Sequence, residues 1–332
     1  MRDRSTQGGG ESPRETLKPS ARRLVMRTVV MALVPLAMIV SATARPLAGQ
    51  APGQRAAAHG DYVGWELCQG CHLDLVNAWK QTKMGKIMLG NPRDSLEAQA
   101  CEACHGPARE HIKKGDISKI FGFKRISRTT AAEKNERCLQ CHEKTARTLW
   151  KGSTHDANGV ACTECHAIMH NMAERANLQK ETVLETCGRC HAQRVAQQMR
   201  FSHMPLSQGK MECTSCHNPH GSPNEKLLIA SSVNETCFTC HVEKRGPYLW
   251  EHAPVTENCA NCHDPHGSNK EKMLKVARPR LCQQCHSPTG HPNTPRNPAT
   301  PADMQFTFNR QCSNCHFNIH GSNHPAGAYL TR

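Results

Sequence analysis

Residues 236–268 read TCFTCHVEKRGPYLWEHAPVTENCANCHDPHGS and contain the pentapeptide CxxCH twice, at 237–241 and 259–263. The chain carries ten copies of this motif, which together use all 20 of its cysteines. Successive copies begin 22 to 37 residues apart. In chain order the cysteines are Cys68, Cys71, Cys101, Cys104, Cys138, Cys141, Cys162, Cys165, Cys187, Cys190, Cys213, Cys216, Cys237, Cys240, Cys259, Cys262, Cys282, Cys285, Cys312 and Cys315. The histidines that close motifs 1 to 10 are His72, His105, His142, His166, His191, His217, His241, His263, His286 and His316.

The CxxCH spacing has a chemical reason. Two thiols three positions apart can bond the two vinyl groups of one haem, and the next imidazole can bind the iron from the same side. A disulfide scaffold gives no reason for a histidine after every second cysteine. Structural zinc uses closed sets of four ligands and would leave most of these histidines unused. The motifs therefore predict ten covalently bound c-type haems, with the motif histidines as proximal iron ligands.

Composition indicates how such a chain folds. The 332 residues include only 14 aromatic side chains, which is little material for a large apolar core. About 29 residues of the expected mature chain are available for each motif, so neighbouring haems should touch. We therefore expect short α-helices and loops wrapped around a stacked chain of ten haems, with almost no β-sheet. No break in composition divides the expected decahaem domain, residues 67–332.

The N-terminus resembles a secretory leader. An apolar run at 29–40 follows a basic stretch and precedes the small residues ATA at 42–44. The run is too short to span a membrane. We expect residues 1–44 to be a signal peptide, with translation starting at the first residue or at Met26, and residues 45–66 to be a linker. Such a leader directs the chain out of the cytoplasm.

The formal net charge is +14, which by itself would suggest a nucleic-acid or membrane-surface partner. The expected leader contains seven Lys and Arg against three Asp and Glu, which leaves +10 on the rest. Ten haems would add twenty propionates. The basic surplus is therefore interpreted as counter-charge for propionates, and a nucleic-acid partner is rejected.

Eleven histidines lie outside the motifs, and nine of them follow a regular pattern. Motifs 4, 6, 8 and 10 each have one three or four residues after the motif histidine. Motifs 3, 5 and 7 have one 11 to 13 residues later, motif 9 has one after five, and motif 2 has one after six. This register predicts that they are the distal iron ligands, unassigned to particular haems: His111, His155, His170, His203, His220, His252, His266, His291 and His320. His324 is interpreted as a spare histidine.

The first motif departs from this pattern. Met84 stands 12 residues after His72, where the other odd-numbered motifs have histidine, and the shared Trp-Lys pairs at 79–80 and 150–151 support the alignment. Methionine is an established axial ligand of c-type haem and raises its reduction potential. Met84 could equally be a packing residue, in which case His59 could bind the iron. Met84 and His59 are therefore the two candidates for the sixth ligand of haem 1.

The stretch at 236–268, the run RLCQQCHSPTGH at 280–291 and the ending IHGSNHPAG at 319–327 resemble the DmsE/MtrA-type periplasmic decahaem c-type cytochromes. The resemblance covers all ten motifs. It implies a periplasmic haem wire inserted into a porin-like β-barrel of the outer membrane. The implied partners are that barrel, periplasmic or inner-membrane cytochromes, and an outer-surface multihaem cytochrome or reductase. The implied electron acceptors or donors are metal oxides, Fe(II) or a sulfoxide reductase. Relatives place a histidine where this chain has Met84.

Two functional classes compete. An electron carrier needs six-coordinate irons, whereas a multihaem reductase of nitrite or another oxyanion needs at least one haem with an open position. Such enzymes often mark that haem with an altered motif such as CxxCK. All ten motifs here keep their histidine. We therefore expect an electron carrier without catalytic residues.

Overall fold

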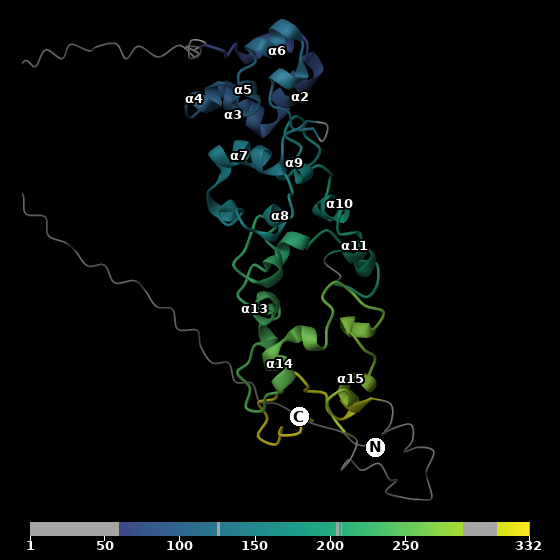
Figure 1. Cartoon of the computed structure of the whole chain (residues 1–332). Helices are drawn as coiled ribbons and strands as arrows, with labels where there is room; N and C mark the ends of the chain where they lie inside the picture. The colour runs from purple at the N-terminus through teal and green to yellow at the C-terminus, as the bar shows by residue number, and fades with distance from the viewer. Residues whose placement is uncertain (1–59, 125–126, 204–205, 207, 288–310, 332) are drawn as a thin grey trace, which may run out of the picture. The chain divides into compact units, whose positions relative to one another are not determined.

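The computed structural model describes residues 60–124, 127–203, 206, 208–287 and 311–331. Figure 1 shows short helices joined by long connections. Within the described residues, strand-like pairing is confined to isolated bridges, among them His217 with Leu228 and His263 with Leu274. The expectation of short helices and loops with almost no β-sheet is therefore confirmed.

The described helices are all short. The α-helices are α1 (Trp65–Gln69), α2 (Leu73–Gln81), α3 (Lys83–Gly90), α4 (Ser95–Ala98), α5 (Cys101–His105), α6 (Arg109–Lys114), α7 (Ala131–His142), α8 (Thr154–Ala157), α9 (Cys162–Cys165), α10 (Val183–Gly188), α11 (Ala192–Gln198), α13 (Val233–Phe238), α14 (Ala253–Glu257) and α15 (Arg280–Gln283). The 3₁₀ turns are η1 (Ile117–Lys119), η2 (Thr145–Arg147), η3 (Cys213–Ser215), η4 (Glu225–Leu227), η5 (Val242–Lys244), η6 (Cys259–Asn261), η7 (Glu271–Met273) and η8 (Cys312–Asn314).

Odd- and even-numbered motifs use these helices differently. The first cysteine of an odd-numbered motif lies in the C-terminal half of a helix, as in α1, α7 and α13. An even-numbered motif begins its helical turn at the first cysteine, as in α5, α9 and η3. The alternation shows that the structural repeat contains two motifs.

Local capping explains where several motif helices begin. Thr130 accepts a hydrogen bond from the backbone N–H of Glu133 at the start of α7, and the Glu133 carboxylate accepts one from the backbone N–H of Thr130. Thr182 and Glu185 form the same reciprocal pair before α10. Ser232 caps α13. Because these caps satisfy N–H groups that a helix end leaves open, they fix the helix start a few residues before each motif.

The apolar core is small. The large buried side chains are Val76, Trp79, Leu139 and Trp150, with Leu228 and other residues at the margin of burial. The first helices pack on one another, α2 against α3, α3 against α4 and α4 against α5. Among the described residues, no helix is long and apolar enough to cross a membrane. The small core agrees with a fold in which the protein does not supply most of the apolar material.

Several predictions concern residues outside the described ranges. The expected signal peptide at 1–44 and most of the expected linker at 45–66 lie there, as do His59 and His291. All described residues fall in one structural unit, residues 53–332.

Candidate haem-binding sites

Motif histidines face other histidines across a nearly constant gap. In six cases the ring of a motif histidine and the ring of a second histidine have centres 5.9 to 6.4 Å apart. Five of these pairs have ring planes within 24° of parallel, and the sixth, His155 with His191, is tilted by 58°. The pairs are His72–His111, His166–His220, His191–His155, His217–His266, His263–His320 and His286–His252.

This separation fits an iron between the two rings. A metal–imidazole bond is about 2 Å long, and an imidazole centre lies roughly 1.2 Å from its nitrogen, so a bridging metal holds the centres roughly 6 Å apart. Within the described part of the chain, no three His, Cys, Asp or Glu side chains converge on a point where a metal ion could bind. The histidine pairs therefore fit the two axial positions of a haem.

Backbone carbonyls orient the motif histidines of the even-numbered motifs. In each case the ring Nδ1 lies 2.6 to 2.8 Å from a carbonyl oxygen further along the chain. An Nδ1–H that donates to a carbonyl leaves the Nε2 lone pair free for a metal and fixes the ring plane. The pairs are His105–Phe121, His166–Ala176, His217–Lys226, His263–Lys272 and His316–Tyr329.

An unusual turn brings two of these carbonyls, those of Lys226 and Lys272, into place. Lys226 and Leu227 both have positive φ angles, 55° and 59°, and Lys272 and Met273 repeat them at 56° and 55°. Residues with side chains rarely adopt this left-handed conformation. The turn folds the chain back on itself. His217 then forms an isolated β-bridge with Leu228, and its ring Nδ1–H donates to the Lys226 carbonyl. The strain is thus located where it positions an imidazole.

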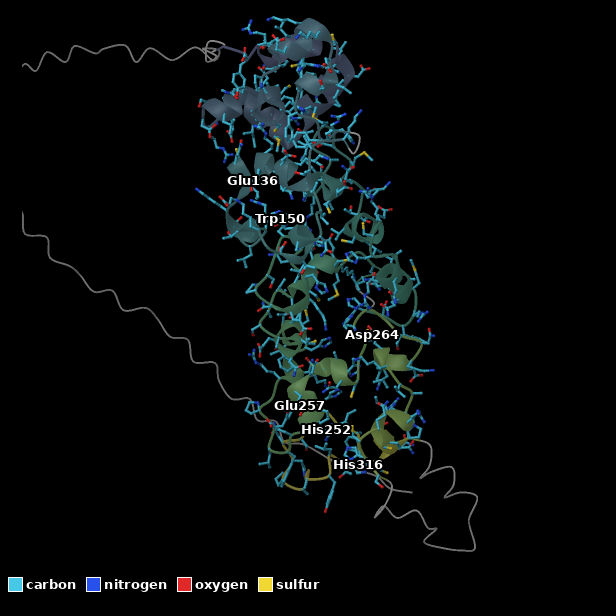
Figure 2. All side chains as sticks on the ribbon, viewed as in Figure 1. Glu136, Trp150, His252, Glu257, Asp264 and His316 are labelled. Atoms are coloured by element: carbon cyan, nitrogen blue, oxygen red, sulfur yellow. The ribbon has the colours of Figure 1, made fainter. Side chains whose placement is uncertain are left out.

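Histidines outside the motifs are fixed in a similar way. His155, His203 and His252 each place Nδ1 within 2.8 to 3.0 Å of a carbonyl oxygen more than 60 residues away. The acceptors are the residues just before three other candidate ligands: Pro219 before His220, Pro265 before His266 and Ile319 before His320. His252 lies at the start of α14 in Figure 2. These bonds tie the ligand of one site to the loop that carries the ligand of another.

The pairs follow a rule of register. The histidines of motifs 4, 6 and 8 face the histidine that lies three or four residues after motifs 6, 8 and 10, respectively. For example, His166 of motif 4 faces His220, which follows motif 6. The histidines of motifs 5 and 9 face the histidine that lies 11 to 13 residues after motifs 3 and 7, respectively. For example, His191 of motif 5 faces His155, which follows motif 3. The sequence alone did not reveal this, because each second histidine lies close in sequence to a motif that it does not face.

The first motif differs from the expectation. His72 faces His111 at 6.4 Å with planes 11° apart, whereas Met84 or His59 was expected there. Helix α6 carries His111 back to motif 1, and the His111 ring is held by the carbonyl of Asp116 at 2.9 Å. The expected position of Met84 opposite His72 is therefore occupied by another side chain.

The cysteines connect the sites in chain order. The first cysteines of motifs 1 and 2, 3 and 4, 5 and 6, 7 and 8, and 9 and 10 lie close enough for one thiol to shift the pKa of the other. The second cysteines of motifs 2 and 3, 4 and 5, 6 and 7, and 8 and 9 lie close enough for the charge of one to raise the pKa of the other. The neighbouring Cys187 thiol, for example, lowers the pKa of Cys213 to about 7. Every motif thus adjoins the next, alternately through its first and its second cysteine.

Two further observations at His220 agree with a haem beside it. Burial lowers the pKa of His220 to about 4, so its imidazole is neutral at pH 7, the form that binds iron. The adjacent Trp150, labelled in Figure 2, has its ring centre 6.4 Å from that of His220. Its buried indole N–H has no hydrogen-bond acceptor among the described residues. A buried donor of this kind is ordinarily satisfied, and a propionate could satisfy it.

Comparison with known proteins identifies the family. The doubled CXXCH motif model matches residues 203–246 and 252–291, and the model described as cytochrome c-type protein NrfB-like matches residues 101–187. The multiheme cytochrome MtrA of Shewanella baltica (strain OS185) is 44% identical over 282 residues, which cover 83% of this chain and 84% of the relative. The chain belongs to the MtrA family of multihaem cytochromes. It is therefore a c-type cytochrome with covalently bound haem, and its role is to carry electrons rather than to catalyse a reaction.

Two other relatives share shorter regions with this MtrA-type cytochrome. Cytochrome c-554 of Nitrosomonas europaea is 32% identical over 103 residues, 28% of this chain and 41% of the relative. The high-molecular-weight cytochrome c of Nitratidesulfovibrio vulgaris is 26% identical over 198 residues, 57% of this chain and 31% of the relative. The chain spans less than half the length of each of these two relatives.

Proposed function

We propose that this MtrA-type cytochrome binds ten haems and carries electrons across the outer membrane inside a porin-like β-barrel. The observation that supports it best is the unbroken series of cysteine neighbours from motif 1 to motif 10. Bound haem iron supplies exchange of one electron between the ferric and ferrous states. Attachment sites that adjoin one another in series give electrons a continuous route.

The proposed iron ligands are argued from the facing histidine rings. The six ring pairs would supply the two iron ligands of haems 1, 4, 5, 6, 8 and 9. The register extends this assignment to His203 opposite His241 and to His170 opposite His105. His291, outside the described residues, is the ligand proposed for the last haem. With a ligand on each side, an iron has no position for a substrate.

A sheath is required by the physical properties of the chain. Charged residues make up 21% of the chain, and a lipid-facing charge or propionate is costly. A transmembrane β-barrel with a polar interior can enclose such a chain across about 30 Å of hydrocarbon. The expected partners on either side are periplasmic or inner-membrane cytochromes and an outer-surface cytochrome or reductase. The expected location is the periplasm and the interior of the barrel.

Proteoliposomes test the proposal. The affinity-tagged holoprotein is purified from outer membranes, either with the β-barrel protein that accompanies it or alone, and each preparation is reconstituted around a membrane-impermeant redox dye. Dithionite added outside should reduce the internal dye only in vesicles that contain both proteins. Reduction by the cytochrome alone would contradict the need for a sheath. No reduction with both proteins present would contradict the conduit.

A further inference from the structure

We infer that Met84 is the sixth ligand of the third haem, opposite His142, which makes this one site methionine-ligated. The inference rests on the proposed function only in requiring that motif 3 holds a haem. It changes the place of the methionine from the first haem of the series to the third.

Met84 occupies the same local structure as His155. In both places a buried tryptophan is followed three residues later by a helix-capping hydroxyl, Thr82 after Trp79 and Ser153 after Trp150. Each capping residue donates its backbone N–H to the tryptophan carbonyl at 2.9 Å.

The caps place the two side chains at the same helical position. The Thr82 hydroxyl accepts a hydrogen bond from Gly85 at the start of α3, and the Ser153 hydroxyl accepts one from Asp156 at the start of α8. Met84 and His155 are each the second residue of the capped helix. Their side chains therefore leave equivalent points of equivalent turns.

The equivalent histidine shows which site such a turn serves. His155 follows motif 3 and faces His191 of motif 5, and His252 follows motif 7 and faces His286 of motif 9. A distal ligand 11 to 13 residues after the histidine of an odd-numbered motif thus serves the motif two positions later. For Met84, which follows motif 1, that motif is motif 3 and the histidine is His142.

The site at motif 1 is already filled. His111 faces His72, and its own ring is oriented by the Asp116 carbonyl. A methionine ligand also needs no such orienting bond, because a thioether has no hydrogen to donate. The substitution of methionine for histidine removes the donor that His155 uses toward Pro219 without leaving an unpaired group on the ligand itself.

The functional consequence is that one haem within the series of ten has a higher reduction potential than the others. Methionine in place of histidine raises the reduction potential of a c-type haem. During reductive titration one haem of the ten should therefore be reduced before the others. An electron entering the chain would rest longest at the third site.

Near-infrared spectroscopy of the oxidised holoprotein tests the inference. Ferric haem with a methionine ligand gives a weak near-infrared charge-transfer band that haem with two histidines lacks. The intensity should correspond to one haem per chain. The band should vanish in Met84→His, with every haem still low-spin, and should persist in Met88→Leu, which changes the methionine one turn further along α3. His155→Met, at the equivalent position, should double it.

The outcomes separate the inference from the proposed function. Haem content is measured first by the pyridine haemochrome assay. Fewer than ten haems per chain would contradict the proposed function, whatever the near-infrared spectrum shows. Ten haems without the band, or a band that survives Met84→His, would overturn the assignment of Met84. Assignment to haem 3 rather than haem 1 is checked with His111→Met, which should add a second band instead of leaving one.

Discussion

The buried side chain of Asn135 accepts a hydrogen bond from the backbone N–H of Cys162 at 2.8 Å and donates one to the carbonyl of Val160 at 3.0 Å. Asn135 lies in the helix of motif 3, and Cys162 begins motif 4. Asn234 forms the same connection to Cys259, between motifs 7 and 8. A single amide thus holds consecutive motifs in register.

Replacing Asn135 should weaken this connection. Asn135→Ala leaves a partly buried N–H and a partly buried C=O without partners, and each costs up to about 1–3 kcal/mol. We expect the free energy of unfolding to fall by about 2–4 kcal/mol in a denaturant titration followed by Soret circular dichroism. Asn158→Ala, at an exposed position, should change it by less than about 0.5 kcal/mol. Equal effects of the two changes would show that the bridge contributes nothing.

Glu102 anchors the segment before motif 1. Its buried carboxylate accepts hydrogen bonds from the backbone N–H groups of Val63, Gly64 and Ala108 at 2.8 to 3.1 Å. Glu102→Gln turns one acceptor into a donor that faces these N–H groups, so we expect a loss of about 1–3 kcal/mol. Limited proteolysis should then cut near residue 63 several times faster. Glu110→Gln, which changes a half-exposed carboxylate on α6, is the control, and an unchanged cleavage rate for Glu102→Gln would argue against the anchor.

Gly221 is required by close packing after His220. It has a φ of 120°, and a Cβ atom there would overlap the carbonyl of Leu149. Gly221→Ala should displace the loop that holds His220 opposite His166 and produce high-spin haem in the electron paramagnetic resonance spectrum. Gly159→Ala is the matched control, since Gly159 also has a positive φ, 68°, but has open space around it. That change should cost about 1 kcal/mol and leave every haem low-spin. High-spin haem in both variants would mean that backbone strain, not packing, is responsible.

His111 should prove essential for the first haem. His111→Ala removes the ring that faces His72, and we expect one high-spin haem per chain with the total haem content unchanged. His59→Ala should leave the spectrum as it is. The reverse result would assign the site to His59 instead of His111.

Much of this cytochrome is determined by local sequence. Each CxxCH pentapeptide specifies its own covalent chemistry, because the spacing of two thiols and one imidazole matches one haem. Capping residues such as Thr130 and Thr182 likewise fix helix starts through bonds to residues three positions away. The small length of chain per motif, about 29 residues, already indicated short helices with little sheet.

The pairing of ligands could not be obtained in this way. His170 lies four residues from His166, yet His166 faces His220, which is 54 residues away. A histidine on the loop that leaves a motif cannot easily reach the opposite side of the haem attached there, whereas a histidine from another repeat can. Only the tertiary structure, through long-range bonds such as that from His155 to the Pro219 carbonyl, decides which repeat supplies it. The sequence therefore determined which residues can bind iron, and the packing of one repeat on another decided which iron each residue faces.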